Sequence, residues 1–416
     1  MVLHMKKIKI LKAACYGTNV SMAVVSSLSP ILFLTFRSLY GISYSLLGAL
    51  VVTNFFTQLL VDLYFSIFSY KIDMEKAVKF TPFLAVIGLI IYGVWPFLFP
   101  NNVYIGLLLG TIIFSASSGF AEVLISPVIA AIPSPDPEKE MSKLHSIYAW
   151  GVVFVVIFCT LFIKAFGHKS WQYLAMILSL LPLFAAIMFS KAEIPHMEKP
   201  EKLSGVMDCF KNKALWLCVV AIFLGGASEC TMAQWSSSYI EKALSIPKVW
   251  GDIFGVALFA LTMAIGRTLY SKIGKNIENI LFFGSIGALV CYLVAALIPY
   301  PLIGLLSCAF TGFFVSMLWP GSLIVSSKRV IGGGVMVYAM MAAGGDLGAS
   351  IGPQLVGSVT DIIISLPASA SLAETFGLSA EQLGIKIGLL SGAIFPLVAC
   401  LIFGYILKTS VRRAKN

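Results

Sequence analysis

The chain has 416 residues, of which 59% are hydrophobic and only 12% are charged, and its mean hydropathy is +0.93. An average soluble domain has about 25% charged residues, so this composition excludes a soluble protein and indicates an integral membrane protein. The formal net charge of +10 would suit a nucleic-acid partner, but its distribution along the chain points elsewhere.

The apolar runs of the chain predict its spanning helices. A helix that crosses a bilayer needs about 20 mostly apolar residues. Twelve runs meet this requirement: 12–35, 42–69, 77–99, 103–132, 144–166, 170–190, 214–239, 250–273, 278–299, 302–327, 333–364 and 384–408. The lysines before the first run are not followed by a small-residue cleavage site, so we expect the first helix to be retained rather than removed as a signal peptide.

The basic residues predict the orientation of these spans. If the N-terminus is cytoplasmic, six of the 29 basic residues fall on the outer side: Arg37, Lys164, Lys169, Lys242, Lys248 and Lys386. Positive charge accumulates on the cytoplasmic side of membrane proteins. We therefore expect a multi-pass protein of the cytoplasmic (inner) membrane with both termini in the cytoplasm, and we expect no nucleic-acid partner.

One long connection divides the spans into two sets of six. It covers residues 191–213 and separates an N-terminal six-helix bundle, 1–190, from a C-terminal bundle, 214–416. A short segment that contains lysine follows the second span of each half, at residues 70–72 and 271–275. An all-α membrane fold with a repeated six-helix unit is typical of secondary transporters that bind substrate at the midplane.

Other functional classes find little support in the sequence. No H-E-x-x-H, G-x-S-x-G or P-loop pattern is present, so we do not expect an enzyme. The eight cysteines are scattered and form no C-x-x-C pair, which argues against disulfides and a metal site. No cofactor is expected. A filter-like repeat, as in channels, is also absent from the sequence.

The fourth run carries one acid in an otherwise uncharged segment, SASSGFAEVLISP, at residues 115–127. At helical spacing Ser115, Ser118 and Glu122 lie near one face. A charged residue in a membrane span costs about 2.5 to 3.5 kcal/mol on insertion scales and is a functional candidate by default. Glu122 is therefore a candidate for binding substrate and for carrying the coupling cation. The alternative is a carboxylate that only joins neighbouring helices.

Two more acids lie in spans of the second half. Glu229 precedes Gln234 and Trp235, which offer hydrogen bonds and an aromatic face to a polyhydroxylated ligand. Asp346 is a second candidate for cation coupling, although Gly344, Gly348 and Gly352 around it also form a small-xxx-small pattern for helix packing. Further substrate-binding candidates are Asn19, Trp319 and Tyr338.

A third group of residues is assigned to gating or to structure. Asn54, Gln58 and Asp62 form an i, i+4, i+8 stripe on the second span, and Asp62 lies toward its cytoplasmic end. His145 and Tyr148 lie at the start of the fifth span. Histidine titrates near physiological pH, but a lone histidine at a membrane boundary is more often a hydrogen-bonding residue.

These stretches resemble the fucose permease-like branch of the major facilitator superfamily. The matching segments are Gln58–Asp62, Gly119-x-x-Glu122 with Pro127, Leu144–Gly151, Glu229 through Trp235, Gly266-Arg267, and Gly345–Gly348 with Gly352-Pro353. The resemblance implies the major facilitator fold, alternating-access symport of a sugar or similar solute, a proton-coupling role for Glu122, and a structural or gating role for Arg267. The first span has no acid, unlike that of fucose permease, so the resemblance does not imply L-fucose as the substrate.

The sequence thus predicts a cation-coupled symporter, with a proton as the expected cation and sodium as an alternative, for a monosaccharide or related polar solute. We expect the carrier to work as a monomer in the lipid bilayer. Two other hypotheses remain open. One is a proton-coupled antiporter that exports drugs or metabolites, and the other is a transport-dead membrane protein that senses a ligand. The identity of the sugar does not follow from the sequence.

Overall fold

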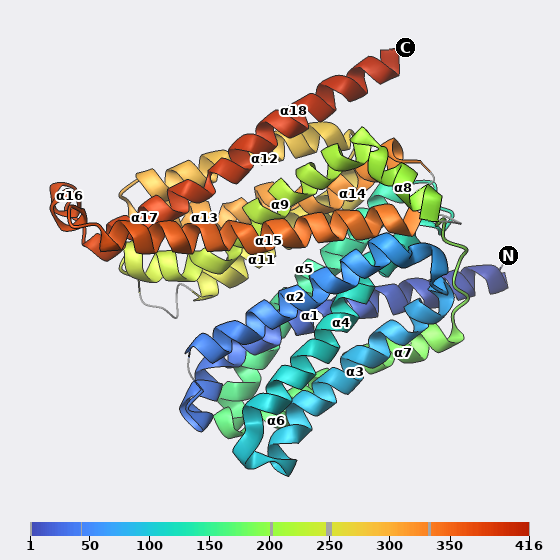
Figure 1. The fold of residues 1–416 in the computed structure, drawn as a ribbon, viewed down its shortest axis with the longest axis horizontal. Coiled ribbons are helices and arrows are strands. Elements are labelled where there is room, and N and C mark those ends of the chain that lie inside the picture. The colour runs from blue at the N-terminus through green and yellow to red at the C-terminus, as the bar shows by residue number, and fades with distance from the viewer. Residues whose placement is uncertain (1, 43, 200–202, 247–251, 332–333, 416) are drawn as a thin grey trace. The chain divides into compact units, whose positions relative to one another are not determined.

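The computed structural model describes residues 2–42, 44–199, 203–246, 252–331 and 334–415, and these residues are almost entirely helical, as predicted (Figure 1). They divide into two compact units. The first contains Met1–Lys211 and Val330–Ala343, and the second contains Asn212–Arg329 and Gly344–Asn416. The chain first passes from one unit to the other within the predicted central connection, and it crosses again after Arg329 and after Ala343. Each unit is described by itself.

The first unit contains eight helices before the division of the chain. They are α1 (Val2–Tyr40), α2 (Tyr44–Phe68), α3 (Met74–Leu98), α4 (Val103–Ala130), α5 (Pro137–Phe166), α6 (Trp171–Leu178), α7 (Leu180–Lys191) and α8 (Leu203–Lys211). The first part of α15 (Gly334–Ser365) groups with them. The predicted sixth span is thus two helices, α6 and α7, which meet at Ser179.

Helix ends in the first unit follow from local sequence. Asp73 begins α3 by accepting a hydrogen bond from the backbone of Lys76 at 3.2 Å, and Asp136 does the same for α5 with Lys139 at 3.3 Å. An N-cap side chain of this kind satisfies an otherwise unpaired backbone N–H. Gly167 ends α5 with a φ of +79°, a conformation that glycine adopts without steric cost.

Aromatic residues fill the core of the first unit. Phe36, Tyr92 and Trp171 are fully buried and pack edge to face, with ring centroids 4.9 to 6.0 Å apart. The polar atoms are paired: Tyr92 shares a 2.9 Å hydrogen bond with Ser29, and Trp171 donates to the Tyr40 hydroxyl at 2.9 Å. Such pairing is expected of tyrosine and tryptophan in an apolar interior.

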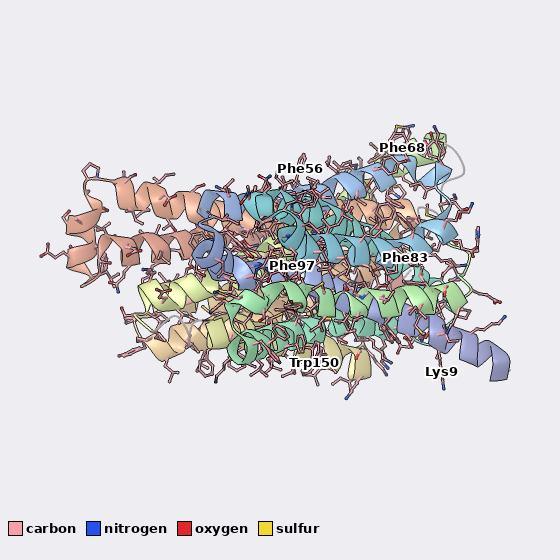
Figure 2. The ribbon with its side chains drawn as sticks, turned by 90° about the horizontal axis from the view of Figure 1, so that it is seen from below. Lys9, Phe56, Phe68, Phe83, Phe97 and Trp150 are labelled. Atoms are coloured by element: carbon pink, nitrogen blue, oxygen red, sulfur yellow. The ribbon has the colours of Figure 1, made fainter. Side chains whose placement is uncertain are left out.

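The outer surface of the first unit is apolar. Phe56, Phe83, Phe97 and Trp150 point outward, and between 43% and 57% of their surfaces are exposed (Figure 2). A continuous exposed apolar surface would be unfavourable in water but suits contact with lipid chains.

The second unit contains α9 (Lys213–Ser238), α11 (Leu258–Ile273), α12 (Ile277–Leu297), α13 (Pro301–Val315), α14 (Leu318–Arg329), the rest of α15, α16 (Ser369–Thr375), α17 (Ala380–Gly392) and α18 (Ile394–Lys415). Short π-helical segments, Tyr239–Ala243 and Asp252–Ala257, lie between α9 and α11. The predicted tenth span is divided at Ser316 and Met317 into α13 and α14.

The glycines of α15 pack against α9 within the second unit. A methyl group on Gly348 would lie 2.0 Å from the Phe223 carbonyl oxygen, and one on Gly352 would lie 2.3 Å from the Thr231 hydroxyl. Glycine is therefore required for this close approach of two helices, which is how small-xxx-small patterns work in membranes.

Eleven segments of the described chain are long and apolar enough to cross a membrane. They coincide with the second to twelfth predicted runs. The first run, 12–35, lies within the helix α1, so each predicted run corresponds to helix in the residues that the structure describes.

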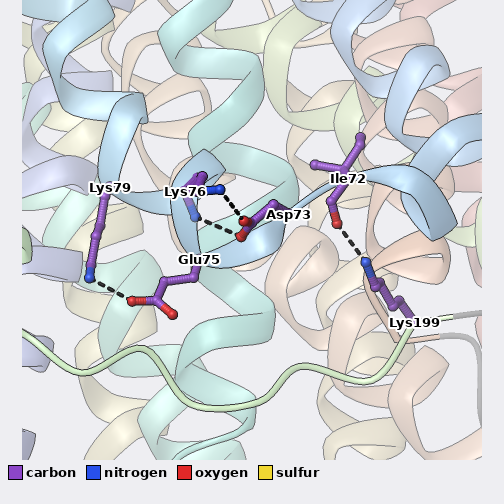
Figure 3. Close-up of polar contacts among 6 residues, drawn as sticks. All are labelled: Ile72, Asp73, Glu75, Lys76, Lys79 and Lys199. Atoms are coloured by element: carbon purple, nitrogen blue, oxygen red, sulfur yellow. Dashed lines mark hydrogen bonds and ion pairs between the residues drawn. The ribbon is translucent and has the colours of Figure 1, made fainter.

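The central connection is held to the first unit by polar contacts. Lys199 donates to the backbone carbonyl of Ile72, in the turn that Asp73 closes with its cap on α3 (Figure 3). Lys7 pairs with Glu193, and the backbone N–H of Val335 donates to the Glu198 carbonyl at 3.0 Å. Residues 192–199 therefore form a strap along one end of this unit rather than a free linker.

Candidate functional site

Two predicted polar stripes of the first unit face each other on α2 and α4. The Ser115 hydroxyl on α4 donates a short hydrogen bond to the side-chain oxygen of Asn54 on α2. One turn further along, a methyl group on Gly119 would lie 3.2 Å from the Cα atom of Gln58, so the two backbones approach closely. This approach places the next pair of side chains, Asp62 and Glu122, beside one another.

The carboxylates of Asp62 and Glu122 form the chemical centre of this face. An oxygen of Asp62 lies within 4.8 Å of an oxygen of Glu122. Asp62 is fully buried and Glu122 is partly exposed. Two negative charges at this distance repel each other strongly where water is scarce. A proton or another small cation placed between them removes that repulsion, so the pair is suited to cation binding.

Polar groups of α1 and α5 contact one another, and one of them also reaches α4. The Asn19 side-chain nitrogen donates to the backbone carbonyl of Leu144 at 3.0 Å, and Asn19 is only 5% exposed. The His145 Nε2 atom lies 3.5 Å from the Ser126 hydroxyl on α4. The Tyr148 hydroxyl donates to the Ser26 hydroxyl at 3.2 Å. Two of these contacts join α1 to α5, and the His145 contact joins α5 to the helix that carries Glu122.

In the second unit, Glu229 on α9 pairs with Arg267 on α11. The Arg267 Nη2 atom lies 3.0 and 3.2 Å from the two carboxylate oxygens of Glu229. The Arg267 Nε atom also donates to the Ser316 carbonyl at 2.8 Å, at the division between α13 and α14. Arg267 is 2% exposed, so the charges of two spans neutralise each other inside the unit.

The aromatic candidates of the second unit are held by neighbouring helices. Trp235 is half-buried, and its indole nitrogen donates to the Pro353 carbonyl on α15 at 3.0 Å. The ring of Trp319 packs on the backbone of Gly345, where a methyl group would lie 2.2 Å from its ring. Gln234 is exposed and Asp346 is 6% exposed. The Asp346 backbone carbonyl accepts a 2.8 Å hydrogen bond from Ser350.

The structure thus brings some predicted site residues together within a unit. Asn54, Gln58, Asp62 and Glu122 lie on the facing sides of α2 and α4, whereas Asn19 and Tyr148 join α1 to α5. Tyr338, buried at 7% exposure near the start of α15, also belongs to the first unit. The direct pairing of Glu229 with Arg267 was not predicted. Both residues were noted in the sequence, but nothing in the spacing of two separate spans indicates that they meet.

Membrane-spanning helices that bury carboxylates beside hydroxyl and amide groups define a polytopic membrane transporter rather than a structural membrane protein. The family model of the Major Facilitator Superfamily matches residues 14–353. The match covers most of the chain, which therefore belongs to the major facilitator superfamily. The superfamily and the fold expected from the sequence motifs are confirmed. No curated protein sequence matches the chain.

Solved structures similar to the chain have the same fold. A variant of the E. coli fucose:proton symporter FucP is 16% identical, with a TM-score of 0.75 over 95% of this chain and 98% of the other. FucP in the outward conformation is also 16% identical, with a TM-score of 0.76 over the same shares. The proton:xylose symporter XylE bound to 6-bromo-6-deoxy-D-glucose is 12% identical, with a TM-score of 0.75 over 97% and 96%.

Proposed function

We propose that the protein is a proton-coupled symporter of a monosaccharide or a related polar solute, which works by alternating access in the cytoplasmic membrane with both termini in the cytoplasm. The observation that carries this proposal is the Asp62–Glu122 pair, two carboxylates within 4.8 Å on adjacent spans. Sugar:proton symporters with the same fold are consistent with it, although an identity of 12–16% supports the fold alone.

The pair supplies the chemistry that proton coupling needs. When both carboxylates are ionised they repel each other, and one bound proton turns the repulsion into a hydrogen bond between an acid and a carboxylate. Glu122 is the partly exposed member and Asp62 the fully buried one. We therefore assign proton exchange with water to Glu122 and assign to Asp62 the role of holding the proton within the pair.

Polar groups around the pair suit a hydroxylated substrate. On α2 and α4, Asn54, Gln58 and Ser115 offer both donors and acceptors in line with Glu122. In the second unit, Gln234 and Trp235 would supply an amide and an aromatic face. Asn19, Trp319 and Tyr338 are proposed as further substrate contacts, and Asp346 as a second acid that takes part in coupling.

The Glu229–Arg267 pair suggests a division of roles in the second unit. Arg267 contacts both oxygens of Glu229, so the carboxylate that would contact a substrate is already paired with a guanidinium group. Such a pair presents acceptors and donors together, as sugar hydroxyls require, and it does not add a second proton site of the kind formed by Asp62 and Glu122.

The test is uptake of a labelled monosaccharide panel into proteoliposomes under an inward proton gradient, an inward sodium gradient, or no gradient. We expect accumulation of one sugar with the proton gradient alone. Glu122→Gln should abolish accumulation while leaving exchange of labelled for unlabelled sugar, because a permanently neutral side chain cannot cycle a proton. Asp62→Asn should impair accumulation, whereas Glu374→Gln, an exposed acid on α16, should behave as wild type.

Each other outcome has a defined meaning. Unchanged accumulation by Glu122→Gln would refute the coupling role of Glu122. Uptake driven by the sodium gradient would mean that sodium, and not the proton, is the coupling cation. Absence of flux for every sugar would refute sugar symport. In that case proton-driven export of lipophilic cations would identify an antiporter, and saturable binding without flux would identify a sensor.

A further inference from the structure

A groove in the second unit lies where α11 turns into α12, on the side that faces α13. Its volume is about 580 Å³, within the range of roughly 300 to 1,000 Å³ found for ligand sites. Ser316, whose carbonyl accepts from Arg267, and Gly266, next to Arg267 in the chain, line the groove, but none of the proposed substrate-binding or coupling residues does. The groove is therefore a separate feature from the proposed transport site.

Tight packing at glycines shapes this groove. Gly274 lies against the ring of Tyr270, where a methyl group would be 2.1 Å from the nearest ring carbon. Gly284 on α12 lies against the Phe314 carbonyl oxygen, 2.7 Å from such a methyl group. Asn276, with a φ of +55°, completes the sharp turn between the helices. The first contact is local, between Gly274 and the last turn of α11, and the second brings α12 against α13.

The walls of the groove are apolar and face outward. Leu269, Ile273, Phe283 and Phe313 line it, and between 38% and 73% of their surfaces are exposed. In a spanning unit such surfaces contact hydrocarbon chains. The natural occupant of an apolar groove that opens toward the membrane is an acyl chain.

The mouth of the groove is basic. Lys275 lines it directly, and Lys272, three residues earlier at the end of α11, is exposed. Glu278, in the first turn of α12, is the acid nearest in sequence, so the segment keeps a net positive charge. This turn lies on the side that the distribution of lysine and arginine predicts to be cytoplasmic. Basic pockets between spans on that side suit anionic lipid headgroups.

We propose that this groove binds one anionic glycerophospholipid, with an acyl chain between α11, α12 and α13 and the phosphate beside Lys275. The acyl chain makes the site specific for a lipid. Free phosphate would interact only with one or two exposed lysines and would bind weakly. The headgroup provides selectivity among lipids, because the groove is no more apolar than the bilayer from which any acyl chain comes. The proposal does not depend on what the protein transports.

Native mass spectrometry of the delipidated, detergent-purified protein tests this proposal directly. It is titrated with phosphatidylglycerol and with phosphatidylcholine of identical chains, and separately with glycerol phosphate. We expect tighter binding of phosphatidylglycerol and no binding of glycerol phosphate at equal concentration. Lys275→Gln should weaken phosphatidylglycerol binding about five-fold, which corresponds to about 1 kcal/mol per lysine. Phosphatidylcholine binding should not change.

Matched variants make the result decisive. Lys408→Gln removes an exposed lysine of α18 outside the groove and should bind as wild type. Ile273→Trp, at a 73% exposed rim position, should reduce binding of both lipids, whereas Phe310→Trp, an exposed position of α13 outside the groove, should not. Equal binding of the two lipids, or equal effects of Lys275→Gln and Lys408→Gln, would overturn the headgroup assignment. Unchanged lipid binding by Ile273→Trp would overturn the position of the acyl chain.

Discussion

The indole nitrogen of Trp235 donates a hydrogen bond to the carbonyl oxygen of Pro353, which fixes the ring of an α9 tryptophan against α15. A methyl group on Gly357, one turn further along α15, would lie 3.1 Å from the same ring. The orientation of the ring is thus set before any ligand arrives. A pre-oriented aromatic face lowers the entropic cost of stacking on a substrate.

Replacing this tryptophan tests its proposed role in substrate binding. Trp235→Phe keeps an aromatic ring but loses a hydrogen bond worth about 1 kcal/mol, so we expect KM for the transported sugar to rise by about five-fold. Trp235→Ala should raise it further. Trp216→Phe, at the exposed other end of α9, is the control. Unchanged KM values in both Trp235 variants would place this residue outside the substrate site.

The ion pair between Glu229 and Arg267 predicts strongly coupled effects on stability. Removing one partner of a buried pair costs about 3 to 5 kcal/mol, because the other charge is left in the interior. We therefore expect Glu229→Gln and Arg267→Gln each to lower the free energy of unfolding by this order. The double variant should be less destabilised than the sum of the two. Chemical unfolding of wild type, the two single variants and the double variant in detergent completes this double-mutant cycle. Additive effects would mean that the two residues are not energetically coupled.

The glycine face of α15 predicts which helix substitutions are tolerated. Gly348→Ala would place a methyl group 2.0 Å from a backbone oxygen of α9, so the helices must separate. Overpacking of this kind costs about 1 to 3 kcal/mol. Gly404→Ala meets only the side chain of Phe282, at 3.2 Å, and should be nearly neutral. Thermal unfolding of the two variants distinguishes these outcomes, and equal melting temperatures would contradict the packing.

The cap of α3 predicts a pH dependence. The backbone N–H of Lys76 and its ammonium group hold the pKa of Asp73 below its usual value of 3.8. A depressed folded-state pKa stabilises the protein above the unfolded value, and this contribution is lost as pH falls through the folded value. The melting temperature of wild type should therefore exceed that of Asp73→Ala near neutral pH, and the difference should shrink below about pH 4.

Asp73→Asn is the matched control for this cap. Asparagine still accepts the hydrogen bond from the Lys76 backbone but does not titrate. We expect the melting temperature of Asp73→Asn to exceed that of Asp73→Ala by most of the wild-type margin at neutral pH. This difference between the two variants should not depend on pH. If the difference between Asp73→Asn and Asp73→Ala also shrank below about pH 4, another titrating group would be responsible.

Periodicity was sufficient to predict which residues share a face, but not which helix a face meets. The stripes of Asn54, Gln58 and Asp62 and of Ser115 and Glu122 followed from helical spacing alone. Their contact depends on Gly119, which lets α4 approach α2, and a sequence does not show which neighbour a small residue serves. For the same reason the pairing of Glu229 with Arg267 did not follow from the sequence, because the two residues belong to different spans.

The breaks in the sixth and tenth spans were also not predicted. Each break is nevertheless followed closely by a proline: Pro182 comes after Ser179, and Pro320 comes after Ser316–Met317. A proline lacks the backbone N–H that would bond the carbonyl four residues earlier, so Pro320 leaves the Ser316 carbonyl without its helical donor. In the tenth span the carbonyl freed at Ser316 is satisfied by Arg267. The prolines therefore signal the breaks, whereas the compensating contact does not follow from the sequence, because Arg267 belongs to another span.

The joining of α9 and α11 by opposite charges also bears on biogenesis. A glutamate or an arginine that enters the bilayer alone costs about 2.5 to 3.5 kcal/mol on insertion scales. These helices carry the seventh and eighth spans, which leave the ribosome one after the other. Their charges can cancel if the two enter the lipid as a hairpin, so each of these marginal segments helps the other to integrate during synthesis.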